Sequence, residues 1–324
     1  MFQIGNVTIE TPIIIGPMAG ITNGAFRELC YEFGASLTYT EMTSDKAIVY
    51  HNQKTMEMLE IDGRFHPVSL QLFGSDRDSM VRAAKVMDED TNADIIDINM
   101  GCPVNKVIKT GAGSAMMRDE DNTAEIVKEI VENVKKPVTA KIRLGYDMQH
   151  MNYLSLAKKL EESGVSAIAI HARTRTQMYE GHSDWSHIRI LKENLSIPVI
   201  GNGDVKSVED YRKMIEECGV DGVMISRGVV GNPFLIKEIR NYLEGREDYA
   251  VNVHERFAYC LSHAQKLITL KGEKTGMREM RGLAPHYLSG LYMSSKYKNE
   301  MTGMNSYGDL VDILERYEKV LNER

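Results

Sequence analysis

Short, almost continuously apolar runs alternate along the chain with longer segments in which apolar residues recur every three or four positions. The short runs predict eight strands, at 13–20, 36–42, 67–74, 94–101, 137–145, 167–173, 198–204 and 222–228. The longer segments predict helices, for example over 119–135, 149–163 and 207–217. Apolar strands separated by helices are typical of a parallel sheet covered on both faces. Eight such units within about 230 residues predict an α/β fold, a (β/α)8 TIM barrel.

An open, doubly wound sheet is the structural alternative. That fold usually carries a glycine-rich turn of the form G-x-G-x-x-G directly after an early strand. Here the first predicted strand ends in GPMAG at 16–20. This turn lacks the required spacing, which favours the barrel.

The alternation stops after residue 244. The remaining chain contains no strand pattern, and it predicts helices over 252–271, 275–293 and 307–322. The charged stretch EGRED at 244–248 interrupts the pattern. We therefore expect two domains, a barrel over 1–244 and a smaller C-terminal helical domain over 245–324.

Composition adds the setting. Of the 324 residues, 43% are hydrophobic and 26% are charged, the balance of an ordinary soluble protein. No apolar run approaches the roughly 20 residues of a membrane span, and the N-terminus does not resemble a secretory signal. The four cysteines form no C-x-x-C pair and have no histidine at metal-ligand spacing. We expect a cytoplasmic protein without a membrane segment or metal; its oligomeric state is not readable, and a monomer is compatible with the sequence.

Polar residues gather where the predicted strands end. In a barrel the chemistry collects at the carboxyl ends of the strands, so a set of polar ends predicts an active-site ring. These ends, in chain order, are Pro17–Met18, Glu41, Gln71, Asn99–Cys102, Lys141 and Arg143, His171 and Arg173, Asn202–Asp204, and Ser226–Gly228.

Three parts of this ring indicate particular chemistry. The glycines of GNGD (201–204) and SRG (226–228) let backbone amides approach an anion, and Arg227 can add a charged fork to a phosphate there. Gln71 would present an amide to the edge of a flavin. Lys141 would place a positive charge beside a reduced flavin, although a structural ion pair is the alternative.

Cys102 differs from the other three cysteines. It lies in the polar loop NMGCPVNKV, next to Gly101 and Pro103, so we expect it to be accessible. A thiol with its ordinary pKa of about 8.5 is mostly protonated at neutral pH and can donate a proton. Cys30, Cys218 and Cys260 lie on predicted helices and are interpreted as packing residues.

The charge distribution bears on nucleic-acid binding. The net charge of −7 argues mildly against such a partner. Between Lys266 and Lys298, however, seven basic residues stand against two acidic ones, a local net charge of +5. Taken alone, this segment is more simply read as a solvated helix face.

Seven motifs together resemble one family. They are PMAGIT, QLFGSD, NMGCP, KIRLG, HARTR, GNGD and SRGVVGNPF, which begin at 17, 71, 99, 141, 171, 201 and 226. Their order and spacing resemble those of the tRNA-dihydrouridine synthases, most closely the bacterial B-type branch. The resemblance is good over residues 10–240 and looser beyond. Two departures are Ser226, where the family usually has glycine, and Ala172, which is commonly glycine; we expect at most a slight remodelling of the flavin corner.

The resemblance implies an FMN-bound barrel and a helical tRNA-binding domain, so the basic segment becomes a candidate RNA contact. NADPH would reduce the flavin, and the flavin would then pass a hydride to C6 of a uridine extruded from tRNA. Cys102 would protonate C5. The implied FMN contacts are Pro17, Met18, Ala19, Gln71, Lys141, His171, Asn202, Gly203, Asp204, Ser226 and Arg227.

Two rival functions stay open at this stage. A flavin barrel that reduces a free small molecule, similar to a dihydroorotate dehydrogenase, would also use the polar ring and Cys102 but would not need the basic helical domain. A non-catalytic RNA-binding barrel would need neither Cys102 nor the phosphate corner. The modified uridine, and the choice between NADPH and NADH, cannot be read from the sequence.

Overall fold

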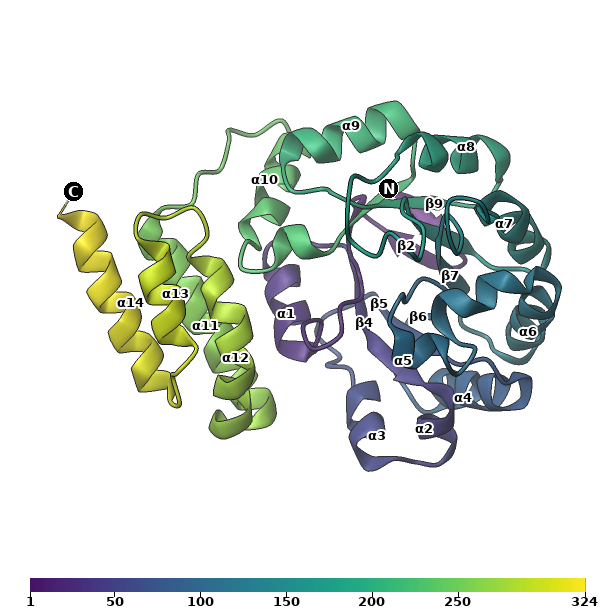
Figure 1. The fold of residues 1–324 in the computed structure, drawn as a ribbon, viewed down its shortest axis with the longest axis horizontal. Helices are drawn as coiled ribbons and strands as arrows, with labels where there is room; N and C mark the ends of the chain where they lie inside the picture. Colours follow the sequence, from purple (N-terminus) through teal and green to yellow (C-terminus); the bar gives the residue numbers. More distant parts are fainter. Residues whose placement is uncertain (324) are drawn as a thin grey trace.

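A closed barrel of eight parallel strands forms the body of the protein (Figure 1). The computed structural model describes residues 1–323. The strands are β3 (Ile13–Ile15), β4 (Leu37–Ser44), β5 (Val68–Phe73), β6 (Ile95–Asn99), β7 (Val138–Arg143), β8 (Ala167–His171), β9 (Val199–Asn202) and β10 (Gly222–Ile225). They pair in chain order, and β10 closes the ring by pairing with both β9 and β3. All eight strand predictions are confirmed, as is the TIM-barrel fold.

Helices cover the outside of the barrel. They are α1 (Gly24–Glu32), α2 (Asp45–Val49), α3 (Gln53–Leu59), α4 (Arg77–Glu89), α5 (Asn105–Ile108), α6 (Glu120–Asn133), α7 (Tyr153–Glu162), α8 (Ser186–Asn194), α9 (Val208–Cys218) and α10 (Phe234–Leu243), with 3-10 turns η1 (Gly113–Arg118) and η2 (Arg227–Val229). Side chains of Asn23, Asp76, Asp119 and Ser207 accept a backbone N–H at the starts of α1, α4, α6 and α9. Such caps define where these helices begin.

A short N-terminal hairpin, β1 (Phe2–Ile4) with β2 (Val7–Ile9), was not anticipated. Ile4 and Ile9 are fully buried in one cluster with residues of the barrel interior, such as Tyr39. The hairpin lies against Pro137 and Ser166, which precede β7 and β8. It therefore closes the end of the barrel opposite the polar strand ends.

Four further helices follow the barrel: α11 (Val253–Lys271), α12 (Glu273–Tyr287), α13 (Ser294–Met301) and α14 (Tyr307–Asn322). The helix predicted over 275–293 is wrong at its end, because α12 stops at Tyr287, and α13 was not predicted. Pro285 lacks an N–H in the last turn, and Gly290 adopts a φ of +80°, so the chain reverses there. None of the helices in residues 1–323 has the length and apolar character needed to cross a membrane.

The four C-terminal helices have a core of their own and also pack directly on the barrel. Tyr297 and Tyr317 stack with ring centroids 4.1 Å apart inside this core. Ala25 of the barrel belongs to the same apolar cluster. The ammonium of Lys266 in α11 lies 2.6 Å from Glu28 Oε1 and 2.8 Å from Glu32 Oε1 in α1. Figure 1 shows α1 on the side of the barrel that faces these helices.

Contacts within the protein change the interpretation of the basic segment. Besides Lys266, Lys271 lies 2.9 Å from Glu279 Oε2. Arg281 donates to the carbonyl of Met304 at 2.6 Å and to Asn305 Oδ1 at 2.5 Å. These three cations are therefore already engaged, whereas Arg278 is exposed. Counting charge along the segment overestimates what it can offer to RNA.

Candidate active site

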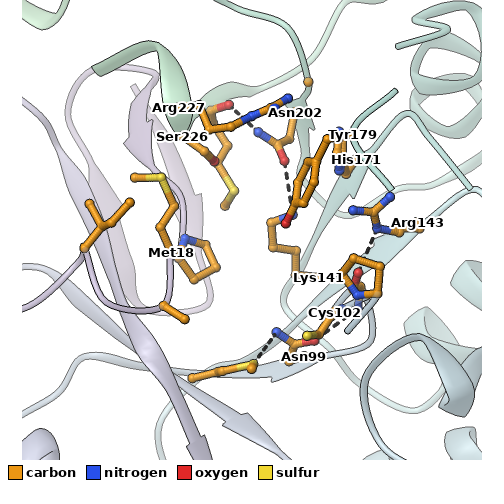
Figure 2. Close-up of a pocket in the computed structure, with 18 of the residues that line it drawn as sticks. Met18, Asn99, Cys102, Lys141, Arg143, His171, Tyr179, Asn202, Ser226 and Arg227 are labelled. Carbon is orange, nitrogen blue, oxygen red and sulfur yellow. Dashed lines mark hydrogen bonds between the residues drawn. The ribbon is translucent and has the colours of Figure 1, made fainter. Parts of the chain in front are cut away.

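A cavity of about 390 Å³ opens at the carboxyl ends of the strands (Figure 2). All twelve site residues predicted from the sequence line it: Pro17, Met18, Ala19, Gln71, Cys102, Lys141, His171, Asn202, Gly203, Asp204, Ser226 and Arg227. They come from the ends of seven different strands, and barrel closure brings them together. Their grouping is a property of the fold and does not depend on what the cavity binds.

Cys102 lies on the loop after β6 and is partly exposed, as predicted. Its backbone N–H donates to Asn99 Oδ1 at 2.9 Å, and its carbonyl accepts from the Ser114 hydroxyl at 2.9 Å. The loop is therefore held on both sides of the thiol. Burial raises the pKa of Cys102, so the thiol is protonated at neutral pH. The other three cysteines are buried in helices, as expected for packing residues.

Gln71 is less available than the sequence suggested, because both ends of its amide already have partners. Its Nε2 donates to Asp97 Oδ2 and its Oε1 accepts from Asn99 Nδ2, each at 2.7 Å. An amide of this kind keeps one further hydrogen and one further lone pair. Gln71 can therefore contact a ligand only with this remaining capacity.

Lys141 places a cation in the floor of the cavity. Its Nζ donates to Asn202 Oδ1 at 3.1 Å, and Asn202 in turn donates to the carbonyl of Met224 at 2.7 Å. Burial, together with the neighbouring charge of Arg143, lowers the pKa of Lys141 to about 8. The ammonium is therefore still predominantly charged at neutral pH.

Other cations surround Lys141. Arg143 is held by the carbonyls of Gly101, Thr174 and Met178, at 2.7, 2.8 and 2.8 Å. Burial keeps the pKa of His171 well below its usual value, and the adjacent Lys141 and arginines act in the same direction. His171 is thus a neutral imidazole in a positively charged cavity. Such a cavity stabilises negative charge on a bound ligand.

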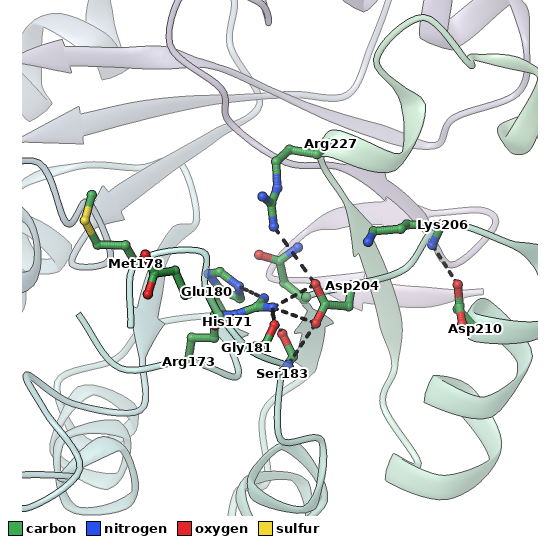
Figure 3. Close-up of polar contacts among 12 residues, drawn as sticks. His171, Arg173, Met178, Glu180, Gly181, Ser183, Asp204, Lys206, Asp210 and Arg227 are labelled. Carbon is green, nitrogen blue, oxygen red and sulfur yellow. Dashed lines mark hydrogen bonds and ion pairs between the residues drawn. The ribbon is translucent and has the colours of Figure 1, made fainter. Parts of the chain in front are cut away.

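The corner after β8 and β9 is organised by a buried arginine (Figure 3). Arg173 lies 2.8 Å from Asp204 Oδ2 and also donates to Ser183 Oγ at 2.8 Å and to the carbonyl of Gly181 at 2.6 Å. Asp204 therefore serves to hold this loop, and its contact with a ligand is not required to explain its presence. Gly203 has a φ of +127°, and a Cβ there would collide with Ser183. Only glycine fits this turn.

Arg227 and Tyr179 form the rim near this corner. The Arg227 guanidinium lies 4.6 Å from the centre of the Tyr179 ring, and 53% of its side chain is exposed. Its Nη2 lies 4.0 Å from Asp204 Oδ1, a long ion pair at an exposed side chain, so the guanidinium can turn toward an anion. Tyr179 was missed by sequence reasoning because it lies on the long segment between β8 and α8, where no strand pattern marks it.

The residues of the cavity fit a flavin mononucleotide. Met18, Met42 and Met224 supply apolar surface for a planar ring, and Lys141 supplies a cation. Gly203, Ser226 and Arg227 line a corner with one cation that would suit a single phosphate. Within residues 1–323, no group of three or more His, Cys, Asp or Glu side chains is arranged to hold a metal ion.

Comparison with solved structures supports the fold. Histamine dehydrogenase from Rhizobium sp. 4-9 superposes with a TM-score of 0.57 at 14% identity, covering 82% of this chain and 50% of that one. A 6-hydroxypseudooxynicotine amine oxidase from Pseudomonas geniculata N1 gives a TM-score of 0.56 at 16% identity, over 75% of this chain and 49% of that one. At these identities the likeness concerns the barrel fold alone.

Sequence comparison identifies the family as well as the fold. The family model described as dihydrouridine synthase matches residues 14–323. A probable tRNA-dihydrouridine synthase of Rickettsia bellii is 38% identical over 325 residues, 99% of each chain. The tRNA-dihydrouridine synthase B of Shewanella oneidensis is 39% identical over 287 residues, 88% of this chain and 89% of that one. A match of this extent, on a barrel with the residues described above, means that the chain belongs to the dihydrouridine synthase family.

Proposed function

We propose that the protein is a tRNA-dihydrouridine synthase that uses FMN and NADPH to reduce the C5–C6 bond of a uridine in tRNA. It would thus be an oxidoreductase acting on a CH–CH bond. The observation that carries the proposal is the meeting of Cys102, Lys141 and the glycine-rich corner in one cavity of a family member. Four unpaired cysteines fit a reducing cytoplasm as its location.

Different residues of the cavity would bind the cofactor and transfer the proton. Gly203, Ser226 and Arg227 would bind the FMN phosphate, Met18 and its neighbours would hold the ring, and Lys141 would sit beside its anionic edge. FMN, when bound, would supply the hydride for C6 of the uracil. Cys102 would donate its proton to C5, and the thiolate left behind would take a proton from solvent.

Arg143 and His171 fit the uracil side of the cavity. Arg143 is oriented by three carbonyls, so its position is set before any substrate arrives. His171, held neutral by its surroundings, can donate one hydrogen bond without adding charge. Both would orient the base, which must leave the RNA stack to enter the cavity.

A groove of about 400 Å³ next to the cavity is a better candidate for RNA contact than the basic segment as a whole. The barrel contributes Lys206 and Arg227, and the C-terminal helices contribute Arg256 and His286. Neither Lys206 nor Arg256 forms a salt bridge with a carboxylate of residues 1–323. Arg256 donates to the carbonyl of Ser289 at 3.1 Å, and the nearby charge of Glu238 opposes the lowering of the Arg256 pKa by burial. Lys206 and Arg256 would contact the phosphates that flank an extruded nucleotide, whereas Arg227 is assigned to the FMN phosphate.

Two measurements test the function, one on the purified protein and one on tRNA. The flavin is released from the protein by heat and identified by mass, and dihydrouridine is mapped in tRNA from a strain lacking the gene. We expect FMN, and the loss of dihydrouridine at one or more positions that returns on complementation. Recovery of FAD, or an unchanged dihydrouridine map together with reduction of a free pyrimidine such as orotate, would contradict the proposal. A folded protein without flavin would favour a non-catalytic RNA-binding barrel.

Removing two groove cations, Lys206 and Arg256, should weaken RNA binding. Each phosphate contact releases condensed counterions, so the variant Lys206→Ala/Arg256→Gln should bind tRNA less tightly. The slope of log affinity against log salt should fall by about 1 to 2. Because Lys206 also lines the active-site cavity, NADPH-driven flavin reduction is compared in the single variant Arg256→Gln, where it should be unchanged. Arg82→Ala, which removes an exposed cation from α4 on the outer wall, is the matched control. Equal salt slopes for the double variant and the control would place the RNA elsewhere.

A further inference from the structure

A chain of hydrogen bonds through two amide side chains, those of Asn99 and Gln71, joins the backbone of Cys102 to a buried carboxylate inside the barrel, Asp97. The N–H of Cys102 donates to Asn99 Oδ1 at 2.9 Å, Asn99 Nδ2 donates to Gln71 Oε1 at 2.7 Å, and Gln71 Nε2 donates to Asp97 Oδ2 at 2.7 Å. The N–H of Gly101 also donates to Asn99 Oδ1, at 3.2 Å. Asp97 is completely buried. Its position in β6, within the sequence IIDIN, was not among the site residues predicted from the sequence.

Strand register explains why these side chains meet. Asp97 and Asn99 are two residues apart on β6, so both point into the barrel. Gln71 of β5 is the register partner of Asp97 on one side, and Thr139 of β7 is its partner on the other. The Thr139 hydroxyl donates to Asp97 Oδ1 at 2.7 Å. Both oxygens of the carboxylate are thus occupied as acceptors.

The two ends of the chain determine its direction. Backbone N–H groups can only donate, and an ionised carboxylate can only accept. Asp97 therefore makes Gln71 turn its NH2 group inward and its carbonyl toward Asn99. Asn99 must then turn its own NH2 toward Gln71 and its carbonyl toward the Cys102 loop. Every hydrogen bond points the same way, and bonds aligned in this manner strengthen one another.

Charge nearby keeps the acceptor end negative. Burial raises the pKa of Asp97 to about 6, and the hydrogen bonds from Gln71 and Thr139 and the cation of Lys141 oppose that rise. At pH 7 and above the carboxylate is therefore mostly ionised, and the direction of the chain is defined.

We propose that Asp97 is a positioning residue: through the amides of Gln71 and Asn99, it fixes the backbone of the loop that presents Cys102 to the cavity. The contribution of Asp97 to catalysis rests on the proposed role of Cys102 as proton donor. Its effect on the loop does not, because that effect concerns only hydrogen bonds within the chain.

Asp97→Asn tests the direction of the chain with almost no change in shape. An amide at position 97 can face Gln71 with either end, so the reversed chain becomes available, in which Asn99 turns its NH2 toward the N–H groups of the loop. We expect backbone amide hydrogen exchange at Gly101 and Cys102 in the flavin-loaded protein to become roughly tenfold faster or more. Single-turnover uridine reduction by the pre-reduced enzyme should fall about ten- to a hundredfold, the loss expected for a hydrogen bond to a charged group.

Two further variants separate direction from packing. Thr139→Val removes the other partner of Asp97 from the same buried site but leaves the carboxylate in place, so exchange at the loop should stay within about twofold of the original protein. The double variant Gln71→Glu with Asp97→Asn moves the carboxylate one position along the chain. The carboxylate introduced at position 71 would accept from both neighbouring amides and restore the direction of Asn99, so slow exchange at Gly101 and Cys102 should return.

The outcomes are distinct. Fast exchange in Asp97→Asn, restored in the double variant and absent in Thr139→Val, supports the proposal even where Cys102 proves not to be the proton donor. Unchanged exchange in Asp97→Asn overturns it. Equal acceleration in Asp97→Asn and Thr139→Val also overturns it, because loss of packing alone would then account for the effect.

Discussion

Cys102→Ala should slow reduction of uridine in tRNA by roughly 10²–10⁴-fold, the usual contribution of a positioned proton donor. The thiol is the one cysteine side chain that reaches the cavity, and burial raises its pKa so that it carries its proton at neutral pH. Alanine removes the donor and leaves the backbone contacts of the loop with Asn99 and Ser114 intact. The measurement is single-turnover reduction of tRNA by enzyme whose flavin has been reduced beforehand.

The Cys102→Ala variant should keep its flavin and accept electrons from NADPH at the original rate, because reduction of the flavin precedes the transfer of the Cys102 proton to uracil. Cys218→Ala is the matched control, since this cysteine is buried in α9 away from the cavity. A pre-reduced Cys102→Ala protein that reduces tRNA as fast as the original would remove the thiol from the mechanism. A variant without flavin would instead mean that the loop serves cofactor binding.

Lys141→Met should slow NADPH-driven flavin reduction by roughly 10²–10³-fold, the cost of removing one well-placed charge from developing negative charge. Stopped-flow loss of the flavin's visible absorbance measures this step without tRNA. Lys136→Met is the matched control: Lys136 lies just before the same strand, at its other end, where it binds the carbonyls of Met87, Asp88 and Thr91. The Lys136→Met control should be less stable, but its rate of flavin reduction should equal that of the original protein.

The pH dependence of the same step follows from the ammonium of Lys141. Its pKa, lowered by burial to about 8, means that the cation is present below pH 8 and is lost above it. Flavin reduction should therefore be full near pH 7 and fall as the pH rises through about 8. Arg143, whose pKa burial lowers only to about 10, remains charged through that range. A rate that stays constant up to pH 9, or a fall that persists in Lys141→Met, would assign the effect to another group.

Much of the barrel and its cavity followed from the sequence by a simple physical rule. Apolar runs such as those around Ile96 and Ile168 are typical of strands buried on both faces in a parallel sheet between helices. Parallel strands end at one rim, so residues at the strand ends, Lys141 and Cys102 among them, had to lie near one another. The resemblance to a known family then supplied the chemistry that polar strand ends alone leave open.

What the sequence could not supply were contacts between residues distant in the chain. Lys266 and Arg281 belong to the basic segment that was a candidate RNA contact. A count of charges does not reveal that Lys266 pairs with Glu28 and that Arg281 donates to the carbonyl of Met304. Arg256 and His286 were not predicted as functional residues. The packing of the C-terminal helices places them in one groove with Lys206 and Arg227. The early end of α12 depended on Pro285 and on Gly290 at positive φ, whereas the prediction followed only the spacing of apolar residues.

The sequence by itself determined the fold class, the strands and the ring of residues at their ends, because hydrophobic periodicity and the edge of a parallel sheet are properties of local order along the chain. Only the tertiary structure decided which polar groups are free to act. It showed that the amide of Gln71 is already shared between Asp97 and Asn99, and that Asp204 is held by Arg173. Such pairings depend on strand register and on loop packing, which bring side chains within hydrogen-bond reach across tens of residues, and no local pattern encodes them.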